Sequence, residues 1–318
     1  MLFRSLAGAA AGAALARSGR AAPAPSPLEI GGAAIQIDLE SAQFDLPEAA
    51  LLDWVKQAAR AVTSYYGRFP VPHARVKILA HHGRGVHGGE SFGDGGVWCR
   101  LSVGSHATQG DLDRDWTMTH EMVHFAFPSV PDRHHWIEEG LATYVEPIAR
   151  ASAGNLTPRQ VWGDMARDMW QGLPEQGDQG LDHTHTWGRT YWGGALYCLL
   201  ADIEIRKNTA NAKGLPDALR AINRAGGSIE VDWPLERALQ VGDHAADGKT
   251  LSKLYLDMRA KPVMVDLPDL WKRLGVVRRD GEVTFDDSAP LAKIRHAITP
   301  EQHAPSATRL PRDTATAG

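Results

Sequence analysis

Thr119-His120-Glu121-Met122-Val123-His124 is the stretch around which we expect this fold to be organised. On a helix, residues four positions apart share one face, with Cβ atoms about 5–6 Å apart, so His120 and His124 can bind the same metal ion. Glu121 would point about 100° away around the helix, where its carboxylate can hold a water molecule rather than the metal. The motif supplies two metal ligands, so a complete site needs a third from elsewhere.

A second helix follows the motif and carries candidate third ligands. After Pro128 and Pro131, helical spacing resumes from His135 to Glu146 and is expected to stop near Pro147. Catalytic zinc usually takes three protein ligands and leaves one position to water. Glu139 would complete a His₂Glu set, and Glu138 is the alternative, about 100° around the same helix.

Glu146 lies two turns beyond Glu139 on the same predicted helix face. A carboxylate in that position can accept the free ring N–H of a ligand histidine and fix its tautomer. We therefore expect Glu146 to orient a ligand histidine without binding the metal itself, and an ordinary surface carboxylate is the alternative.

Three ordered segments resemble the gluzincin zinc metallopeptidases: His120 to His124, Trp136-Ile137-Glu138-Glu139-Gly140-Leu141-Ala142, and Tyr191-Trp192-Gly193-Gly194. In the aminopeptidase branches of that group, the glutamate before the glycine of Trp-x-x-Glu-Gly is the third zinc ligand, so the resemblance implies Glu139 rather than Glu138. The Tyr-x-x-Gly helix start, shared with the glycyl aminopeptidase-like branch, carries a tyrosine that helps to stabilise the oxyanion. The resemblance implies that role for Tyr191.

The resemblance spans residues 97–206 and departs from the family pattern in three places. The interval between His124 and Glu139 is shorter than usual, and the lysine that commonly precedes the tyrosine-motif glycine is Gly193 here. The Gly-x-Met-Glu-Asn segment that holds the substrate's amino terminus in many relatives has no counterpart beside the strand expected at 97–103. Cleavage within a peptide and cleavage from its end therefore both stay open.

The function implied is that of a zinc metallopeptidase with one Zn²⁺ per chain, bound by His120, His124 and Glu139. Glu121 would act as general base on the zinc-bound water, and Tyr191 would share the oxyanion with the metal. One alternative is a zinc hydrolase of a non-peptide amide. The other is a pseudopeptidase, a binding module that presents the cleft and an edge strand to a partner.

The fold expected is α+β, and the resemblance implies a thermolysin-like gluzincin core with the zinc site between two lobes. Residues 28–107 form an N-terminal α/β lobe, residues 108–150 the zinc-binding helices, and residues 151–298 a mainly α-helical lobe. Within the first lobe we expect strands at 33–39, 75–80 and 97–103, a helix at 47–66 and a glycine-rich loop at 83–96. The alternation at 97–103 is typical of a half-exposed edge strand, which can bind an extended peptide, and an ordinary strand within the sheet is the alternative.

Several helices are expected around and after the motif. A capping box at Thr108 and Asp111 opens a helix that carries the motif to about Phe127. The tyrosine segment lies on a helix over 188–206. The remaining expected elements are helices at 157–169, 215–225, 251–258, 267–274 and 289–297, and a strand at 281–285.

Composition limits the partners. The 318 residues carry a formal net charge of −4 and no run of Lys or Arg, which argues against nucleic-acid binding. The expected partner is a peptide or protein substrate, and the chain is expected to be a monomer. Two cysteines, Cys99 and Cys198, cannot form a metal cluster, and both pairing and burial as free thiols remain open.

The two ends of the sequence differ from the rest. Arg4, an Ala-rich run at 6–16 and small residues at 21–24 predict a signal peptide over 1–24 and hence export, periplasmic or secreted. A disordered Ala-rich leader is the alternative. No other stretch is apolar enough to span a bilayer. Residues 299–318 are rich in Pro, Thr and Ala, and we expect a disordered tail.

Other polar clusters are interpreted as surface features. The segment Asp182 to Trp187, which holds His183 and His185, is expected to be a polar loop, although it could line the cleft or bind a second metal. The pairs His81-His82 and His134-His135 are expected to be solvated. The aspartates at 111, 113 and 115 lack the glycine turn of a calcium loop.

Overall fold

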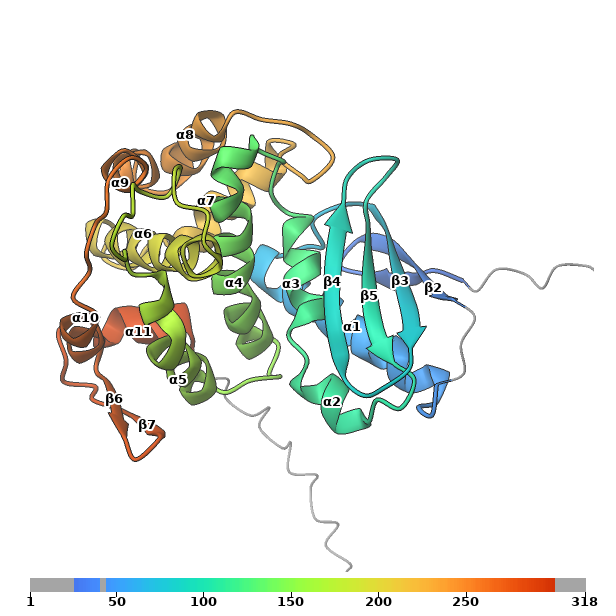
Figure 1. Cartoon of the computed structure of the whole chain (residues 1–318). Helices are drawn as coiled ribbons and strands as arrows, with labels where there is room; N and C mark the ends of the chain where they lie inside the picture. The colour runs from blue at the N-terminus through green and yellow to red at the C-terminus, as the bar shows by residue number, and fades with distance from the viewer. Residues whose placement is uncertain (1–25, 41–43, 301–318) are drawn as a thin grey trace, which may run out of the picture.

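The computed structural model describes residues 26–40 and 44–300. The predicted signal peptide and the tail from 301 lie outside these ranges. Thr299, which the sequence assigned to the tail, is buried and accepts a hydrogen bond from Trp162 Nε1 at 2.7 Å. Two lobes lie side by side, an N-terminal lobe built on a sheet and a helical C-terminal lobe (Figure 1).

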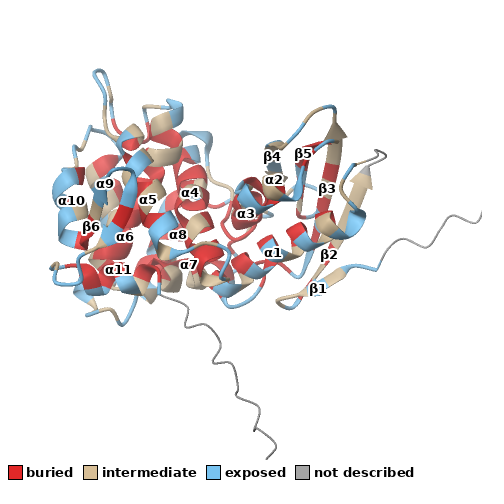
Figure 2. Ribbon diagram, turned by 90° about the horizontal axis from the view of Figure 1, so that it is seen from below, coloured by how far each residue is buried: buried red, intermediate tan, exposed pale blue. Residues whose placement is uncertain are grey.

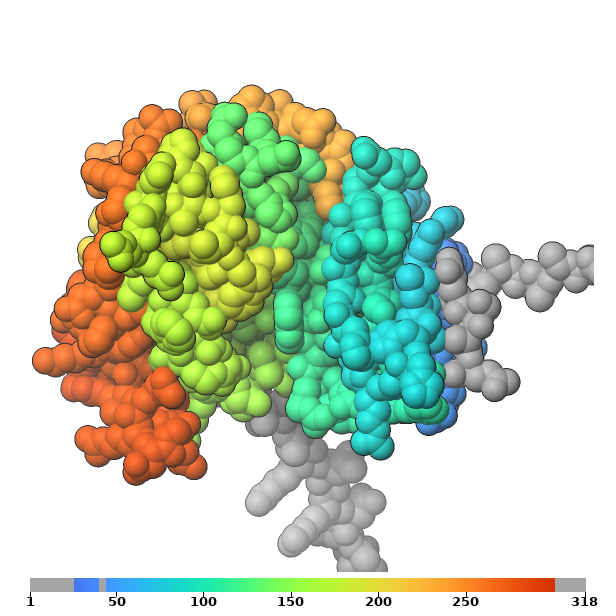
Figure 3. Space-filling view, viewed as in Figure 1, coloured from blue at the N-terminus to red at the C-terminus, as the bar shows by residue number. Residues whose placement is uncertain are grey.

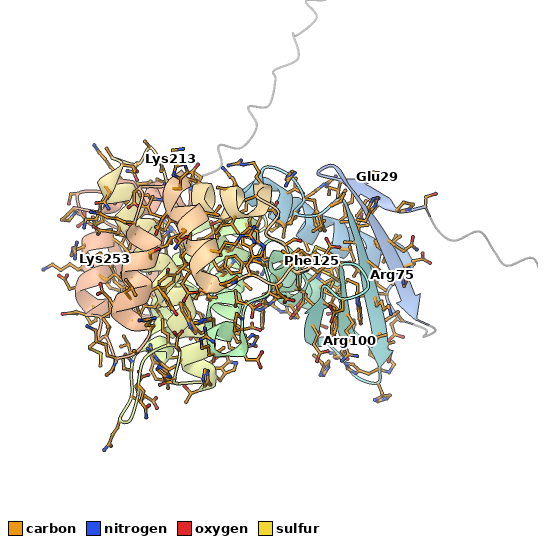
Figure 4. All side chains as sticks on the ribbon, turned by 90° about the horizontal axis from the view of Figure 1, so that it is seen from above. Glu29, Arg75, Arg100, Phe125, Lys213 and Lys253 are labelled. Atoms are coloured by element: carbon orange, nitrogen blue, oxygen red, sulfur yellow. The ribbon has the colours of Figure 1, made fainter. Side chains whose placement is uncertain are left out.

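A five-stranded sheet in the order β1-β2-β3-β5-β4 forms the first lobe. β2, β3 and β5 run parallel, and β1 and β4 pair antiparallel at the two ends. One face packs on helix α1 through alternating apolar residues such as Ile35, Val76 and Leu101, while Arg75 and Arg100 lie on the opposite face (Figure 4). The elements are β1 (Leu28–Ile30), β2 (Ala33–Glu40), α1 (Glu48–Tyr66), β3 (His73–His81), β4 (Val86–Phe92) and β5 (Trp98–Gly104).

The edge of the sheet differs from the prediction. β5 has the predicted alternation, with Cys99, Leu101 and Val103 buried, but it is an interior strand between β3 and β4. The edge is β4, which the sequence analysis interpreted as part of a glycine-rich loop. Its glycines weaken the strand signal, and it forms because its backbone pairs with β5 from Val86 to Phe92 across a β-bulge.

The predicted motif helix is two helices rather than one. α2 (Gln109–Arg114) starts with the predicted capping box at Thr108 and Asp111, and α3 (Thr117–His124) carries the motif. The break lies at Asp115, whose backbone is extended and whose carboxylate accepts hydrogen bonds from the backbone N–H groups of Thr117 and Met118, both at 3.0 Å. Asp115 thus caps the start of α3.

Helix α4 (His135–Ser152) continues through Pro147 instead of stopping there. It lies between the lobes together with α3, and both are largely buried (Figure 2). The predicted helices of the second lobe are present, together with α8, which was not predicted. The remaining helical elements are the 3₁₀ turns η1 (Asp132–His134) and η2 (Met169–Gly172), the π-helix η3 (Arg189–Gly193), and α5 (Pro158–Asp168), α6 (Gly194–Asn208), α7 (Leu215–Arg224), α8 (Leu235–Ala245), α9 (Thr250–Met258), α10 (Leu267–Leu274) and α11 (Ala292–Ile298).

β6 (Val276–Arg279) and β7 (Glu282–Phe285) form a small hairpin between α10 and α11, and β7 matches the strand expected near 281–285. Cys99 and Cys198 are both buried and free. Within the described residues, no helix has the length and apolar character needed to cross a membrane.

Candidate metal centre

Helices α3 and α4 bring together His120, His124 and Glu139. Glu139 Oε2 lies 3.1 Å from His120 Nε2 and 3.7 Å from His124 Nε2. One nitrogen or oxygen from each residue lies within 4.8 Å of those of the other two, so the three can hold a single ion. The geometry follows from the helical spacing of the motif and from the short turn 125–134 that places α4 beside α3.

The protonation of this group suits a cation. Burial and the neighbouring His120 lower the pKa of His124 to about 4, so its imidazole is neutral at pH 7. Burial acts to raise the pKa of Glu139, but its hydrogen bond with His120 and the nearby imidazoles lower it below the ordinary range. His124 therefore offers a neutral imidazole and Glu139 an ionised carboxylate, the states that metal binding requires.

Glu138, the alternative ligand, is turned to other partners. Its Oε2 lies 3.1 Å from His135 Nδ1, and its Oε1 accepts a hydrogen bond from the backbone N–H of Val130. The hydrogen bond with Glu138 also raises the pKa of His135. His135 is exposed, and its Nε2 lies 3.3 Å from Glu139 Oε1, so it borders the group.

Glu146 lies behind the group but does not make the contact expected from the sequence. Its carboxylate pairs with Arg150 at 2.9 Å, and both side chains are buried. We expected Glu146 to accept a ring N–H from one of the two histidines, but the Nδ1 of His120 is buried and has no hydrogen-bond partner within the described residues. Burial raises the pKa of Glu146 to about 7.

Glu121 faces edge strand β4. Ser91 Oγ donates to the Glu121 carboxylate at 2.7 Å and lies 2.8 Å from its backbone carbonyl. Burial raises the pKa of Glu121, which makes its carboxylate a stronger base than an exposed one. Gly89 lies so close that a Cβ there would be 2.5 Å from Glu121 Cγ. Neither Ser91 nor Gly89 was singled out from the sequence, because β4 carried no clear strand pattern.

Tyr191 comes from η3, the π-helical turn before α6. π-Helical turns are rare and frequent at functional sites. The Tyr191 ring stacks on His120, with ring centres 6.2 Å apart, and burial together with the charge of Glu139 raises its pKa to about 12. Its hydroxyl therefore remains protonated at neutral pH. The predicted tyrosine thus lies beside the predicted ligands.

One open cleft of about 1070 Å³ between the lobes is lined by His120, Glu121, His124, Glu139 and Tyr191. Figure 3 shows the furrow that it forms, with the green surface of residues near 100–150 between the two lobes. β4 lines one side, α3 and α4 contribute His120, His124 and Glu139, and the loop before α8 adds Ile229, Glu230 and Asp232.

The remaining polar clusters lie elsewhere. His183 and His185 are exposed and do not line the cleft. His134 is not solvated as predicted: it is fully buried, and its Nδ1 lies 2.9 Å from Asp182 Oδ1. Asp182 also accepts hydrogen bonds from Trp136 Nε1 and from the Tyr255 hydroxyl, so it ties the start of α4 to α9.

The comparisons with known proteins agree at the level of the fold. No protein-family model and no curated protein matches the sequence. An aminopeptidase N family protein from Idiomarina loihiensis has a similar structure, with a TM-score of 0.59 and 13% identity over 79% of this chain and 49% of that one. A variant of an M1 zinc metallopeptidase from Deinococcus radiodurans gives a TM-score of 0.50 and 15% identity over 77% and 53%.

This chain therefore spans about half the length of these two structures. At such identities the likeness concerns the fold alone: the chain has a mixed α/β fold similar to those of this aminopeptidase N family protein and this M1 zinc metallopeptidase.

Proposed function

We propose that this chain is a zinc-dependent peptidase whose zinc is held by His120, His124 and Glu139. The observation that carries the proposal is the convergence of two imidazole nitrogens and a carboxylate oxygen within 4.8 Å on the wall of an open cleft. Catalytic zinc takes this kind of donor set and leaves a position for water or substrate. The neutral state of His124 and the ionised state of Glu139 fit the same ion.

Zinc bound at this position supplies Lewis-acid polarisation of the scissile carbonyl and activates water for attack. Glu121 accepts the proton from the attacking water and passes it to the leaving amine. Ser91 holds the Glu121 carboxylate in place for this transfer. Tyr191, protonated at neutral pH, donates a hydrogen bond to the negative charge that develops on the carbonyl oxygen.

The substrate is a peptide that lies along the cleft beside β4. β4 is a terminal strand of the sheet, so one of its edges is free to form backbone hydrogen bonds with an extended chain. This is the role that the sequence analysis gave to 97–103, now placed on the strand at the edge. The edge supports a peptide over a small non-peptide amide, because only an extended backbone can use it.

A binding module without catalysis is the second candidate. It would use the same cleft and edge strand. The placement of Glu121 and Tyr191 argues against it, because a module that only binds has no need of a buried carboxylate held by Ser91 or of a phenol beside the ligand group.

The decisive experiment compares wild type with Glu121→Gln. Zinc per chain is measured by elemental analysis, and a peptide library with free or acetylated amino termini is digested and analysed by mass spectrometry. We expect about one zinc per chain in both proteins and cleavage by wild type alone. Wild type that binds zinc but cleaves neither form of the library would favour the binding module. The acetylated set separates cleavage within a chain from removal of its first residue.

A further inference from the structure

A second cavity, of about 550 Å³, adjoins the open cleft that contains His120, His124 and Glu139. The two spaces share Trp116, His120 and Tyr191 as lining residues, so the second opens directly beside the candidate metal centre. Its volume falls within the range of about 300–1,000 Å³ that is usual for ligand pockets. We call this cavity the side pocket.

Exposed aromatic rings flank the side pocket. Of the five large apolar side chains that are exposed in the described part of the chain, two line it: Trp116, 52% exposed, and Trp187, 59% exposed. Trp187 stacks on Tyr191 with ring centres 5.4 Å apart, and Tyr191 stacks in turn on His120. Trp116 meets the His120 ring edge-on at 5.1 Å. A continuous aromatic surface thus runs from the metal centre into the side pocket.

Apolar side chains also line its interior. Leu156, Val161, Met165 and Trp192 contribute from the loop before α5, from α5 and from η3. The part of α4 after Glu139 also lines the side pocket, through Thr143, Glu146 and Pro147. The side pocket therefore offers apolar and aromatic contacts next to the place where the reaction would occur.

Most charged residues around the side pocket are paired with opposite charges. Glu146 pairs with Arg150, Arg167 with Asp164 and Asp168, and Arg114 with Asp111. Asp113 accepts a hydrogen bond from Gln109. These existing pairs reduce the attraction of the side pocket for a charged occupant, whereas an uncharged one is not affected by them.

We propose that the side pocket binds a large apolar or aromatic side chain of the peptide, next to the bond that is cleaved, and that Trp116 and Trp187 determine this preference. The inference rests on the proposed peptidase function, and it names the class of substrate. Continuity with the cleft makes a substrate side chain the natural occupant, because a peptide backbone held beside β4 and His120 carries its side chains within reach. Stacking on exposed tryptophans favours Phe, Tyr or Trp over aliphatic residues of similar size.

The test uses the zinc-loaded full chain and two sets of peptides. In one set the residue before the cleaved bond is Ala, Leu or Phe, and in the other set the residue after the bond is varied in the same way. We expect wild type to cleave the best Phe peptide with a kcat/KM roughly tenfold or more above that of the Ala peptide, as burial of a large apolar side chain implies. Trp187→Ala and Leu156→Trp should each reduce this Phe-to-Ala ratio severalfold, the first by removing a stacking surface and the second by filling the space.

Trp170→Ala is the matched control. Trp170 is exposed to 62% but lines neither the cleft nor the side pocket, so the ratio and the overall rate should stay as in wild type. A wild type that cleaves Phe and Ala peptides equally well at both positions would overturn the side-pocket proposal and leave the peptidase proposal intact. A ratio unchanged in both side-pocket variants would do the same.

A binding measurement separates the two proposals if no peptide is cleaved. N-acetylphenylalanine amide and N-acetylalanine amide are titrated into zinc-loaded wild type, Trp187→Ala and Trp170→Ala, and ligand contacts are followed by saturation-transfer NMR. Binding of the Phe amide alone, lost in Trp187→Ala and kept in Trp170→Ala, would support the side pocket even in a protein without peptidase activity. Equal signals from the two amides in wild type would overturn it.

Discussion

Gly140 on α4 and Gly194 at the start of α6 are in backbone contact. A Cβ on Gly140 would lie 2.3 Å from the Cα of Gly194, and a Cβ on Gly194 would lie 2.1 Å from the carbonyl oxygen of Trp136. Each glycine follows a residue of the candidate site: Gly140 comes directly after Glu139, and Gly194 comes three residues after Tyr191. We therefore expect this contact to influence how closely Tyr191 approaches the proposed metal ligands.

We expect Gly140→Ala to push α4 and α6 apart, and to lower both stability and activity. Overpacking of this kind costs about 1–3 kcal/mol, and it moves the Tyr191 hydroxyl relative to Glu139. Urea unfolding and kcat/KM measure the two effects. Gly163→Ala on α5 is the control, because its added Cβ would make only an ordinary 3.4 Å contact with Val283. Equal behaviour of the two variants would contradict the role of the close contact.

Glu139→Ala should weaken zinc binding far more than Glu138→Ala. Glu139 lies within reach of both histidines, whereas Glu138 contacts His135 and Val130. We expect a loss for Glu139→Ala above the 10–100-fold that is typical of residues that only support a ligand. Competition with a chromogenic chelator at pH 7 measures the affinity. A larger loss in Glu138→Ala would reverse the ligand assignment.

Tyr191→Phe should lower kcat by about 10²–10³-fold, the usual cost of removing one donor to a developing oxyanion. Zinc content should stay the same, because the hydroxyl is not proposed as a ligand. Tyr197→Phe is the matched control. The Tyr197 hydroxyl is buried and donates to the Leu251 carbonyl, and Tyr197 does not line the cleft. A Tyr191→Phe enzyme with wild-type kcat would remove Tyr191 from the mechanism.

Ser91→Ala should lower kcat and move the acid limb of the kcat/KM profile to higher pH. The Ser91 hydroxyl holds the Glu121 carboxylate and acts to lower its pKa, so its loss leaves the base both less well placed and protonated at higher pH. One hydrogen bond of about 1 kcal/mol corresponds to roughly fivefold in rate. Ser102→Ala, on the outer face of β5, is the control. An acid limb that stays in place would argue against this contact.

The buried carboxyl group of Glu146 should make the free energy of unfolding of this protein depend on pH. Its pKa is raised from 4.5 in the unfolded chain to about 7 by burial. Between these values the folded protein keeps a proton that the unfolded chain has released, so the free energy of unfolding falls as pH rises through this window. The full shift corresponds to about 3 kcal/mol.

The glutamine in Glu146→Gln does not titrate, so the advantage of wild type over this variant should shrink from pH 4.5 to pH 7. Urea unfolding at constant metal content measures the difference. A difference between the two proteins that stays constant, or grows, across this range would contradict the shifted pKa.

The two helices that carry His120, His124 and Glu139 were predictable from the sequence because their signals are local. Two histidines four residues apart share a helix face whatever surrounds them, and the resemblance of 136–142 to Trp-x-x-Glu-Gly pointed to Glu139, which lies beside both histidines. Local signals also gave the capping box at Thr108 and the buried face of β5. Predictions from local signals were wrong where contacts with distant parts of the chain outweighed them. Pro147 does not end α4, because the helix residues on either side of it, among them Val145 and Ile148, are held in the core.

Edge strand β4 and the burial of His134 show the same limit. β4 is rich in glycine and forms because its backbone pairs with β5. The sequence of 83–96 has no alternating apolar pattern that would predict this strand. His134 is buried because Asp182, 48 residues later, supplies an acceptor for its ring. Both outcomes depend on groups that are distant in the sequence.

By itself, the sequence determined which side chains were candidates for a metal centre: the helical repeat places His120 and His124 on one face, and a second helix follows with Glu138 and Glu139. The resemblance to the gluzincins then favoured Glu139. Only the tertiary structure decided what surrounds that centre. It placed Ser91 against Glu121, brought Gly140 onto Gly194, and opened the side pocket behind His120. The physical reason is that helix periodicity is a short-range property of the chain, whereas the packing of strands and helices depends on contacts between residues far apart in it.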